Sequence, residues 1–118
     1  MRLGIPHGQA IKILVVTGPA QGLEFELSRP LMTIGRLGGE ADIQIDDPEV
    51  SRLHCAVEVR RDAILLRDLR SLNGTFIDGS QVFAARLKGT SQFCIGSSCL
   101  QIDILLAPVL EQGLKTKV

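Results

Sequence analysis

Short apolar stretches recur along this chain about every eight to twelve residues, each bounded by Gly, Pro, Asp or Asn. No window longer than ten residues shows an apolar stripe with the 3.6-residue spacing of a helix. Closely spaced strands separated by turn residues are typical of all-β domains. The stretches predict ten strands, at residues 11–16, 23–27, 31–35, 42–45, 54–59, 63–69, 74–77, 81–87, 92–95 and 99–105.

The number of strands indicates how they are layered. Ten twisted strands normally divide into two sheets packed face to face. A chain of 118 residues with 45% hydrophobic content is long enough for one core and short for two. We therefore predict one all-β domain, a two-sheet antiparallel β-sandwich with functional loops at its ends. The continuously apolar stretch 11–16 predicts a strand buried on both faces.

The net charge of the chain limits the kinds of partner that it can bind. Thirteen basic and thirteen acidic residues cancel, so no global field draws the chain onto nucleic acid or a membrane surface, and we predict neither as a partner. Any anion site must be local. Eight arginines and no lysine lie between Arg29 and Arg86. The planar guanidinium matches phosphate geometry, although solvated strand faces explain most of these arginines equally well.

The three cysteines do not follow a zinc or redox spacing. Cys55 and Cys94 sit in apolar runs, which predicts thiols in the core, as for Cys99. No stretch approaches the length of a membrane span, and the first residues do not form an export signal. These observations predict a cytoplasmic location.

Enzyme motifs are weak or missing. Ser51 and His54 could form a nucleophile and its base, but no strained G-x-S-x-G elbow surrounds the serine. The glycines of residues 35–39 are not followed by the Lys-Ser/Thr of a phosphate-binding P-loop. His7, His54 and the scattered cysteines do not form a metal-ligand set. We predict no enzyme activity, no cofactor and no metal.

Three separate segments nevertheless share a chemistry. Gly35-Arg36 ends one predicted strand, Ser51-Arg52 precedes another, and residues 71–75 lead into a very short one. Loops at one end of a sandwich can meet, and together these offer guanidinium groups, hydroxyls and an amide. That set suits a phosphate ester carrying about 1.5 to 2 negative charges.

The order Gly35-Arg36, then Ser51-x-x-His54, then Ser-x-Asn-Gly-Thr at residues 71–75 resembles the forkhead-associated (FHA) domain family. The flanking strands resemble it from about residue 11 to residue 104. The resemblance implies an FHA/SMAD-like sandwich of ten to eleven strands whose loops bind a phosphothreonine peptide in extended form. It implies an FHA domain at 11–106, a flexible lead at 1–10, and a tail or linker start at 107–118.

The resemblance also implies which residues contact the ligand. Arg36 is similar to the family arginine that contacts the phosphate or the adjacent peptide backbone, and Ser51 to the hydroxyl donor to the phosphate. Arg52 occupies a variable position, so its guanidinium either contacts the phosphate or points to solvent. Asn73 is similar to the asparagine whose amide pairs with the peptide main chain.

Four residues are predicted to shape the loops rather than touch the ligand. The resemblance assigns Gly35 and Gly74 to tight backbone positions, His54 to a brace between loops, and Thr75 to a structural hydroxyl. At Leu72 the chain departs from the family, where Ser or Thr often donates to the phosphate.

The loop at residues 46–50 suggests a ligand preference. Asp46, Asp47 and Glu49 are predicted to repel an acidic residue at the third position after the phosphothreonine, which leaves an apolar or basic residue there. The resemblance predicts a phosphothreonine-containing partner protein and an upstream Ser/Thr kinase. A phospho-independent protein-interaction module on the same fold is the alternative.

Overall fold

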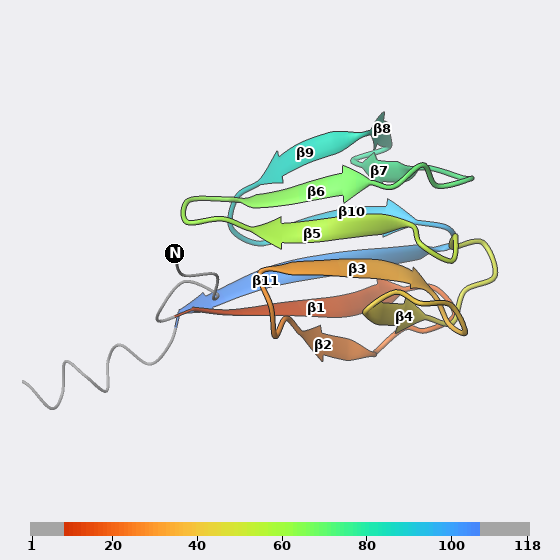
Figure 1. Ribbon diagram of the computed structural model, residues 1–118, viewed down its shortest axis with the longest axis horizontal. Helices are drawn as coiled ribbons and strands as arrows, with labels where there is room; N and C mark the ends of the chain where they lie inside the picture. The colour runs from red at the N-terminus through yellow and green to blue at the C-terminus, as the bar shows by residue number, and fades with distance from the viewer. Residues whose placement is uncertain (1–8, 107–118) are drawn as a thin grey trace, which may run out of the picture.

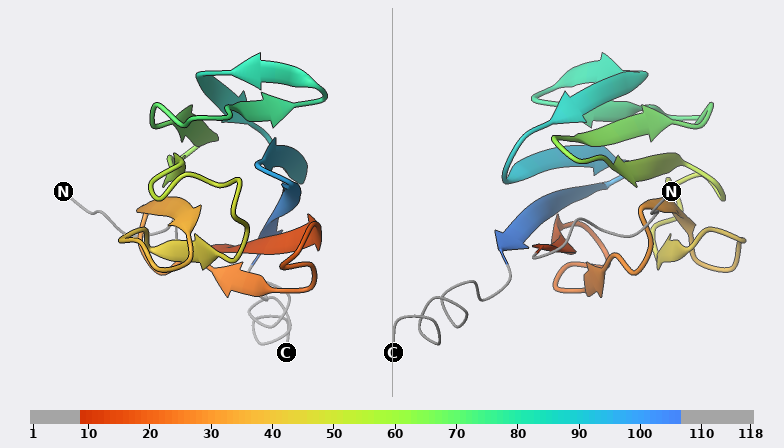
Figure 2. Two further views of the ribbon diagram at one scale, coloured as in Figure 1. Left: turned by 90° about the vertical axis from the view of Figure 1, so that its right-hand side faces the viewer. Right: turned by 60° about the vertical axis from the view of Figure 1, so that its left-hand side comes forward.

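The computed structural model describes residues 9–106 as a sandwich of two β-sheets (Figures 1 and 2). In chain order the strands are β1 (Gln9–Thr17), β2 (Glu24–Glu26), β3 (Leu31–Arg36), β4 (Ile43–Ile45), β5 (Cys55–Val59), β6 (Ile64–Asp68), β7 (Thr75–Ile77), β8 (Ser80–Val82), β9 (Ala84–Leu87), β10 (Ser91–Ile95) and β11 (Ser98–Leu106). One sheet has the order β2-β1-β11-β10-β7-β8 and the other β4-β3-β5-β6-β9. The predicted fold class is confirmed.

Two details of the strands differ from the prediction. The stretch 81–87 is two strands, because the chain crosses from one sheet to the other at Phe83. In addition, β3 and β4 are parallel, with Ile34 opposite Ile43, whereas the other strand pairs of the described residues are antiparallel. Residues 37–42 carry the chain back along β3, so β4 starts again in the same direction.

Strand β1 is buried on one face only, which corrects the expectation for residues 11–16. Ile11, Ile13 and Val15 are fully buried, while Leu14 and Val16 are half-buried on the other face. An outer face of a two-layer sandwich meets solvent even where its residues are apolar.

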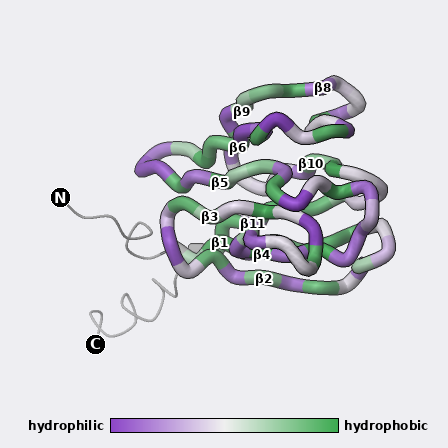
Figure 3. The backbone as a smooth tube through the Cα atoms, turned by 45° about the vertical axis from the view of Figure 1, so that its right-hand side comes forward, coloured by the Kyte–Doolittle hydropathy of each residue, from purple (hydrophilic) through white to green (hydrophobic). Residues whose placement is uncertain are grey.

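The core fills the space between the sheets. Figure 3 shows hydrophobic residues along the strands and hydrophilic ones in turns such as that between β5 and β6. Each fully buried aliphatic or aromatic side chain contributes about 1.5–3 kcal/mol. The largest of them are Phe93, Ile11, Ile13, Ile34, Ile45, Ile64, Leu66, Ile95, Leu100 and Ile102.

The cysteines correct another expectation. Cys94 and Cys99 lie directly opposite each other on β10 and β11 and form a disulfide, so only Cys55 is a core thiol. Complete burial raises the pKa of the Cys55 thiol. The hairpin register that pairs Cys94 with Cys99 was not evident from their spacing.

The ends of the described chain lie side by side. β1 begins at Gln9, two residues before the predicted boundary, and pairs there with Leu106 at the end of β11. The rest of the predicted lead, residues 1–8, and the predicted tail, residues 107–118, lie outside the described residues. The described part of the chain contains no helix long and apolar enough to cross a membrane.

Candidate functional site

Three loops meet at the end of the sandwich where β3 and β6 finish: residues 37–42, 46–54 and 69–74. They lie on the right in Figure 1 and face the viewer in the left panel of Figure 2. We call these loops, with Arg36, the loop rim. Two hydrogen bonds at Ser51 connect it, since the Ser51 carbonyl accepts from Arg36 N–H and its Oγ accepts from Leu72 N–H, both at 2.9 Å.

Arg36 is the last residue of β3, and its position depends on the glycine before it. Its guanidinium donates to the Val50 carbonyl at 3.2 Å. A Cβ on Gly35 would lie 1.9 Å from the Arg52 carbonyl oxygen, so the loop before β5 passes directly over Gly35. Only glycine permits this approach.

His54 is fully buried and joins two loops. Its Nδ1 accepts the Ser51 N–H at 3.0 Å, and its Nε2 lies 2.9 Å from the Gly74 carbonyl oxygen. The neutral ring with its proton on Nε2 satisfies both contacts. Burial lowers the pKa of His54, against the opposing effect of the Gly74 carbonyl, and so favours this neutral form.

Asn73 forms a second connection between the same loops. Its side-chain Nδ2 donates to the Glu49 carbonyl at 2.9 Å, while the residue itself is exposed. The turn continues through Gly74, whose φ of 93° lies in the left-handed region that glycine adopts without strain.

Asp68 organises the loop before β7, and the sequence did not single it out. Its carboxylate accepts from Ser71 N–H at 3.0 Å, from Ser71 Oγ, and from the buried Thr75 hydroxyl at 2.7 Å. Burial raises its pKa, but the hydrogen bonds from Ser71 and Thr75 outweigh that effect and hold the pKa below its usual value. A polar side chain three residues before Ser71 was the available signal.

Asp47 has a comparable role and corrects the prediction for residues 46–50. It is fully buried, and its carboxylate accepts from Glu49 N–H at 2.9 Å, Ser97 N–H at 2.8 Å and Ser98 Oγ at 2.6 Å. It therefore fixes the base of the loop to the turn before β11 and does not face a ligand. Only Asp46 and Glu49 present exposed acidic side chains there.

The arginines of the described residues fall into two groups. Four of the eight, all on or beside the strands, have carboxylate partners: Arg29, Arg60, Arg67 and Arg86. Within residues 9–106 the other four have none: Arg36, Arg52 and Arg70 of the loop rim, and Arg61 of the β5–β6 turn. Leu72, at the position where the family often has a hydroxyl, is 88% exposed.

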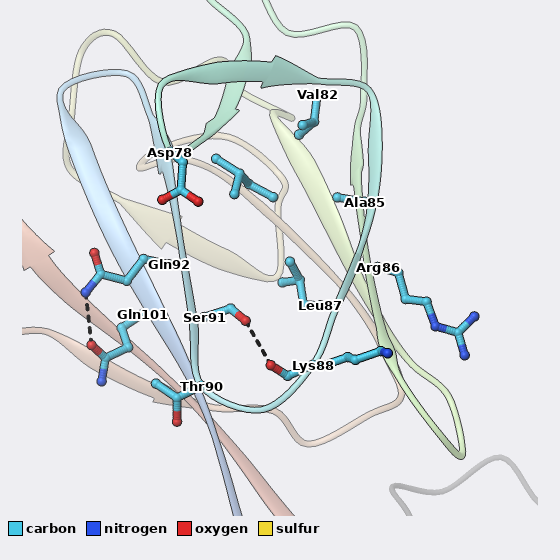
Figure 4. Close-up of a pocket in the computed structure, with 11 residues that line it drawn as sticks. Asp78, Val82, Ala85, Arg86, Leu87, Lys88, Thr90, Ser91, Gln92 and Gln101 are labelled. Atoms are coloured by element: carbon cyan, nitrogen blue, oxygen red, sulfur yellow. Dashed lines mark hydrogen bonds between the residues drawn. The ribbon is translucent and has the colours of Figure 1, made fainter.

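A hollow of about 720 Å³ lies away from the loop rim, along the side of the sandwich. Figure 4 shows its wall, where Gln92 and Gln101 are hydrogen-bonded and Ser91 donates to the Lys88 carbonyl. None of the predicted site residues lines it. Among residues 9–106, no three His, Cys, Asp or Glu side chains are grouped to hold a metal ion.

The family model of the FHA domain matches residues 32–96, more than half of the chain and all three loops of the rim. The chain belongs to the FHA domain family. The match runs from inside β3 to the turn after β10, so the strands that support the loops are included.

Two curated proteins are similar to this FHA domain. The glycogen accumulation regulator GarA of Mycolicibacterium smegmatis is 34% identical over 79% of this chain and 58% of its own length. The oxoglutarate dehydrogenase inhibitor of Corynebacterium efficiens is 38% identical over 63% of this chain and 51% of its own length. The chain thus spans little more than half the length of these relatives.

A solved structure supports the same assignment. An FHA domain studied for phosphothreonine-dependent interactions superposes with a TM-score of 0.70 and 26% identity, covering 80% of this chain and 95% of the other. The two proteins therefore share the same fold.

Proposed function

We propose that this FHA domain binds phosphothreonine-containing segments of partner proteins, downstream of a Ser/Thr kinase and in the cytoplasm, without catalytic activity. The observation that carries the proposal is the convergence of Arg36, Ser51 and Asn73 at one rim, with Arg36 lacking a carboxylate partner in residues 9–106. The match to the FHA model and the similarity to proteins named as a regulator and an inhibitor support a binding role.

The chemistry of the rim fits a phosphate dianion. Ser51 Oγ accepts the Leu72 N–H, which leaves the hydroxyl proton to be donated to a phosphate oxygen. The free N–H groups of Arg36 and Arg52 supply charge-assisted hydrogen bonds. Asn73 uses one N–H on Glu49, so its carbonyl oxygen and second N–H remain for the main chain of an extended peptide.

The hydrogen bonding of His54 argues against catalysis. A general base for Ser51 would have to accept the proton of its Oγ. The Nδ1 of His54 instead accepts the backbone N–H of Ser51, and Nε2 is directed to the Gly74 carbonyl. Both ring nitrogens are thus used in holding the loops.

Phospho-independent recognition is the second candidate, and Leu72 favours it. An exposed leucine at the rim cannot donate to a phosphate, but it offers apolar contact area to a protein partner. A pull-down with and without phosphatase treatment, at low and high salt, separates the two. Capture that persists after phosphatase treatment and in high salt selects the phospho-independent function.

Replacing Arg36 by Ala tests the proposal directly. A degenerate phosphothreonine peptide array first supplies a ligand, and calorimetry then compares variants. We expect Arg36→Ala to lose about 2 kcal/mol or more of binding free energy, since it leaves one side of a desolvated charge pair unmatched. Arg61→Ala is the matched control, because Arg61 is exposed in the β5–β6 turn and lacks an ion-pair partner in the described chain. Equal affinity of both variants would contradict the assigned role.

A further inference from the structure

Arg70 has a backbone conformation that arginine disfavours. Among residues 9–106, only Arg70 and Asp78 combine a positive φ with a side chain, at 59° and 52°. Aspartate tolerates this left-handed region because its short polar side chain can form hydrogen bonds with nearby groups of the chain. The long arginine side chain has no comparable local hydrogen bond to offset the strain. A glycine would take the same conformation without strain.

The surrounding hydrogen bonds impose this conformation on the loop before β7. On one side, Leu69 N–H donates to the His54 carbonyl at 2.9 Å. On the other, Ser71 N–H donates to the Asp68 carboxylate at 3.0 Å. Arg70 lies between these two fixed points, so the chain must turn there whatever its side chain is.

Within the described protein, no interaction of the Arg70 side chain offsets the strain of its positive φ. It is exposed and forms no hydrogen bond or ion pair with another described residue. It is also two residues from Leu72, whose N–H binds Ser51 Oγ at the centre of the rim. A cation held at this position is therefore available to a ligand that lies on the rim.

Charge divides the rim into two sides. The loop before β5 exposes Asp46 and Glu49 together with Arg52, and residues 37–42 expose Glu40, whereas Arg70 is the only charged residue of the loop before β7. An extended peptide that crosses both loops meets opposite charges on the two sides of its phosphothreonine. The Cα atom of Arg70 lies at most about 7 Å from that of Leu72, whose N–H binds Ser51 Oγ, and an extended peptide covers that distance in roughly two residues, so a residue two or three positions from the phosphothreonine can approach Arg70.

We propose, on the basis of the phosphothreonine-binding function, that Arg70 is a specificity-determining residue that binds a second acidic group of the ligand. That group is an Asp, Glu or further phosphorylated residue on the side of the phosphothreonine facing residues 69–74. The preferred ligand is thus a phosphothreonine peptide that is acidic on one side only.

The test combines stability with a scan of the ligand. Arg70→Gly, Arg70→Lys and the parent are titrated with phosphothreonine peptides that carry Asp or Ala at each position within three residues of the phosphothreonine. The parent should prefer Asp on one side by about threefold to tenfold, Arg70→Lys should keep most of that preference, and Arg70→Gly should lose it. Urea unfolding should show a higher midpoint for Arg70→Gly, because glycine relieves the backbone strain.

Asp78→Gly is the matched control, since it relieves a positive φ in the β7–β8 turn without altering the rim. Its ligand preference should equal that of the parent. An Asp preference that is the same in the parent and Arg70→Gly, or absent from the parent, overturns the role of Arg70 while phosphothreonine binding stands. A parent that binds phosphorylated and unphosphorylated peptides equally overturns the proposed function and this inference together.

Discussion

Single side chains at the rim divide into those that hold loops and those left free for a ligand. His54, Asp68 and Asp47 use their polar atoms inside the protein. The sequence motif singled out His54, but it gave no reason to separate Asp47 from its exposed neighbour Asp46. Burial of a carboxylate depends on hydrogen-bond donors, which here come from about fifty residues along the chain: Ser97 in the turn before β11 and Ser98 at the start of that strand.

The tautomer of His54 leads to a pH dependence of stability. Burial holds the pKa of His54 in the folded state below its ordinary 6.5. As the pH falls below about 6.5, the unfolded chain binds a proton that the folded chain does not, so the free energy of unfolding falls. The slope attributable to His54 is at most about 1.4 kcal/mol per pH unit.

Urea unfolding at intervals between pH 7.5 and 5 measures this slope. His54→Gln should remove it, whatever that variant does to stability at pH 7.5. His7 is the only other histidine of the chain and remains in both proteins, so the difference isolates His54. An identical pH profile in the parent and the variant would contradict the neutral buried ring.

At the scale of strands and loops, turn residues located most of the elements. The very short strand predicted at residues 74–77 is β7, and the Asn73-Gly74 turn that precedes it marks its start. The division between β8 and β9 was missed because nothing in the apolar run 81–87 marks the crossing at Phe83. The parallel pairing of β3 with β4 was also missed, since pairing direction depends on where the intervening loop returns.

The contact between the end of β3 and the loop before β5 predicts the effect of Gly35→Ala. A methyl group 1.9 Å from the Arg52 carbonyl oxygen forces this loop away from β3. We expect a loss of about 1–3 kcal/mol in the free energy of unfolding and weaker phosphopeptide binding, because Ser51 moves with the loop. Both are measured on one preparation by urea unfolding and calorimetry.

Gly39→Ala provides the comparison. Its added Cβ would lie 3.2 Å from the same carbonyl oxygen, and its φ is not positive. This variant should lose clearly less stability than Gly35→Ala. The close approach at Gly35 is refuted if the two variants unfold at the same urea concentration.

For the whole molecule, the spacing of apolar stretches was sufficient to predict two packed sheets, because a strand count of ten or more leaves few other arrangements. The FHA-like motifs then placed the candidate site at one end. The Cys94–Cys99 disulfide and the burial of β1 on one face could not be predicted from the sequence. Both depend on which strands pair and in which register, and the apolar pattern does not determine either. The described ends of the chain lie together, with Gln9 opposite Leu106.

We propose that one end of the sandwich binds a phosphothreonine. The most direct measurement is an NMR titration of the isotopically labelled chain with a phosphothreonine peptide from the array, beside the same peptide without phosphate. We expect phosphate-dependent shifts of backbone amides at residues 36–39, 49–54 and 70–75, and none in the turns at 60–62 and 88–90 at the opposite end. Shifts centred on those opposite turns or on the side hollow, or equal shifts with both peptides, would contradict it.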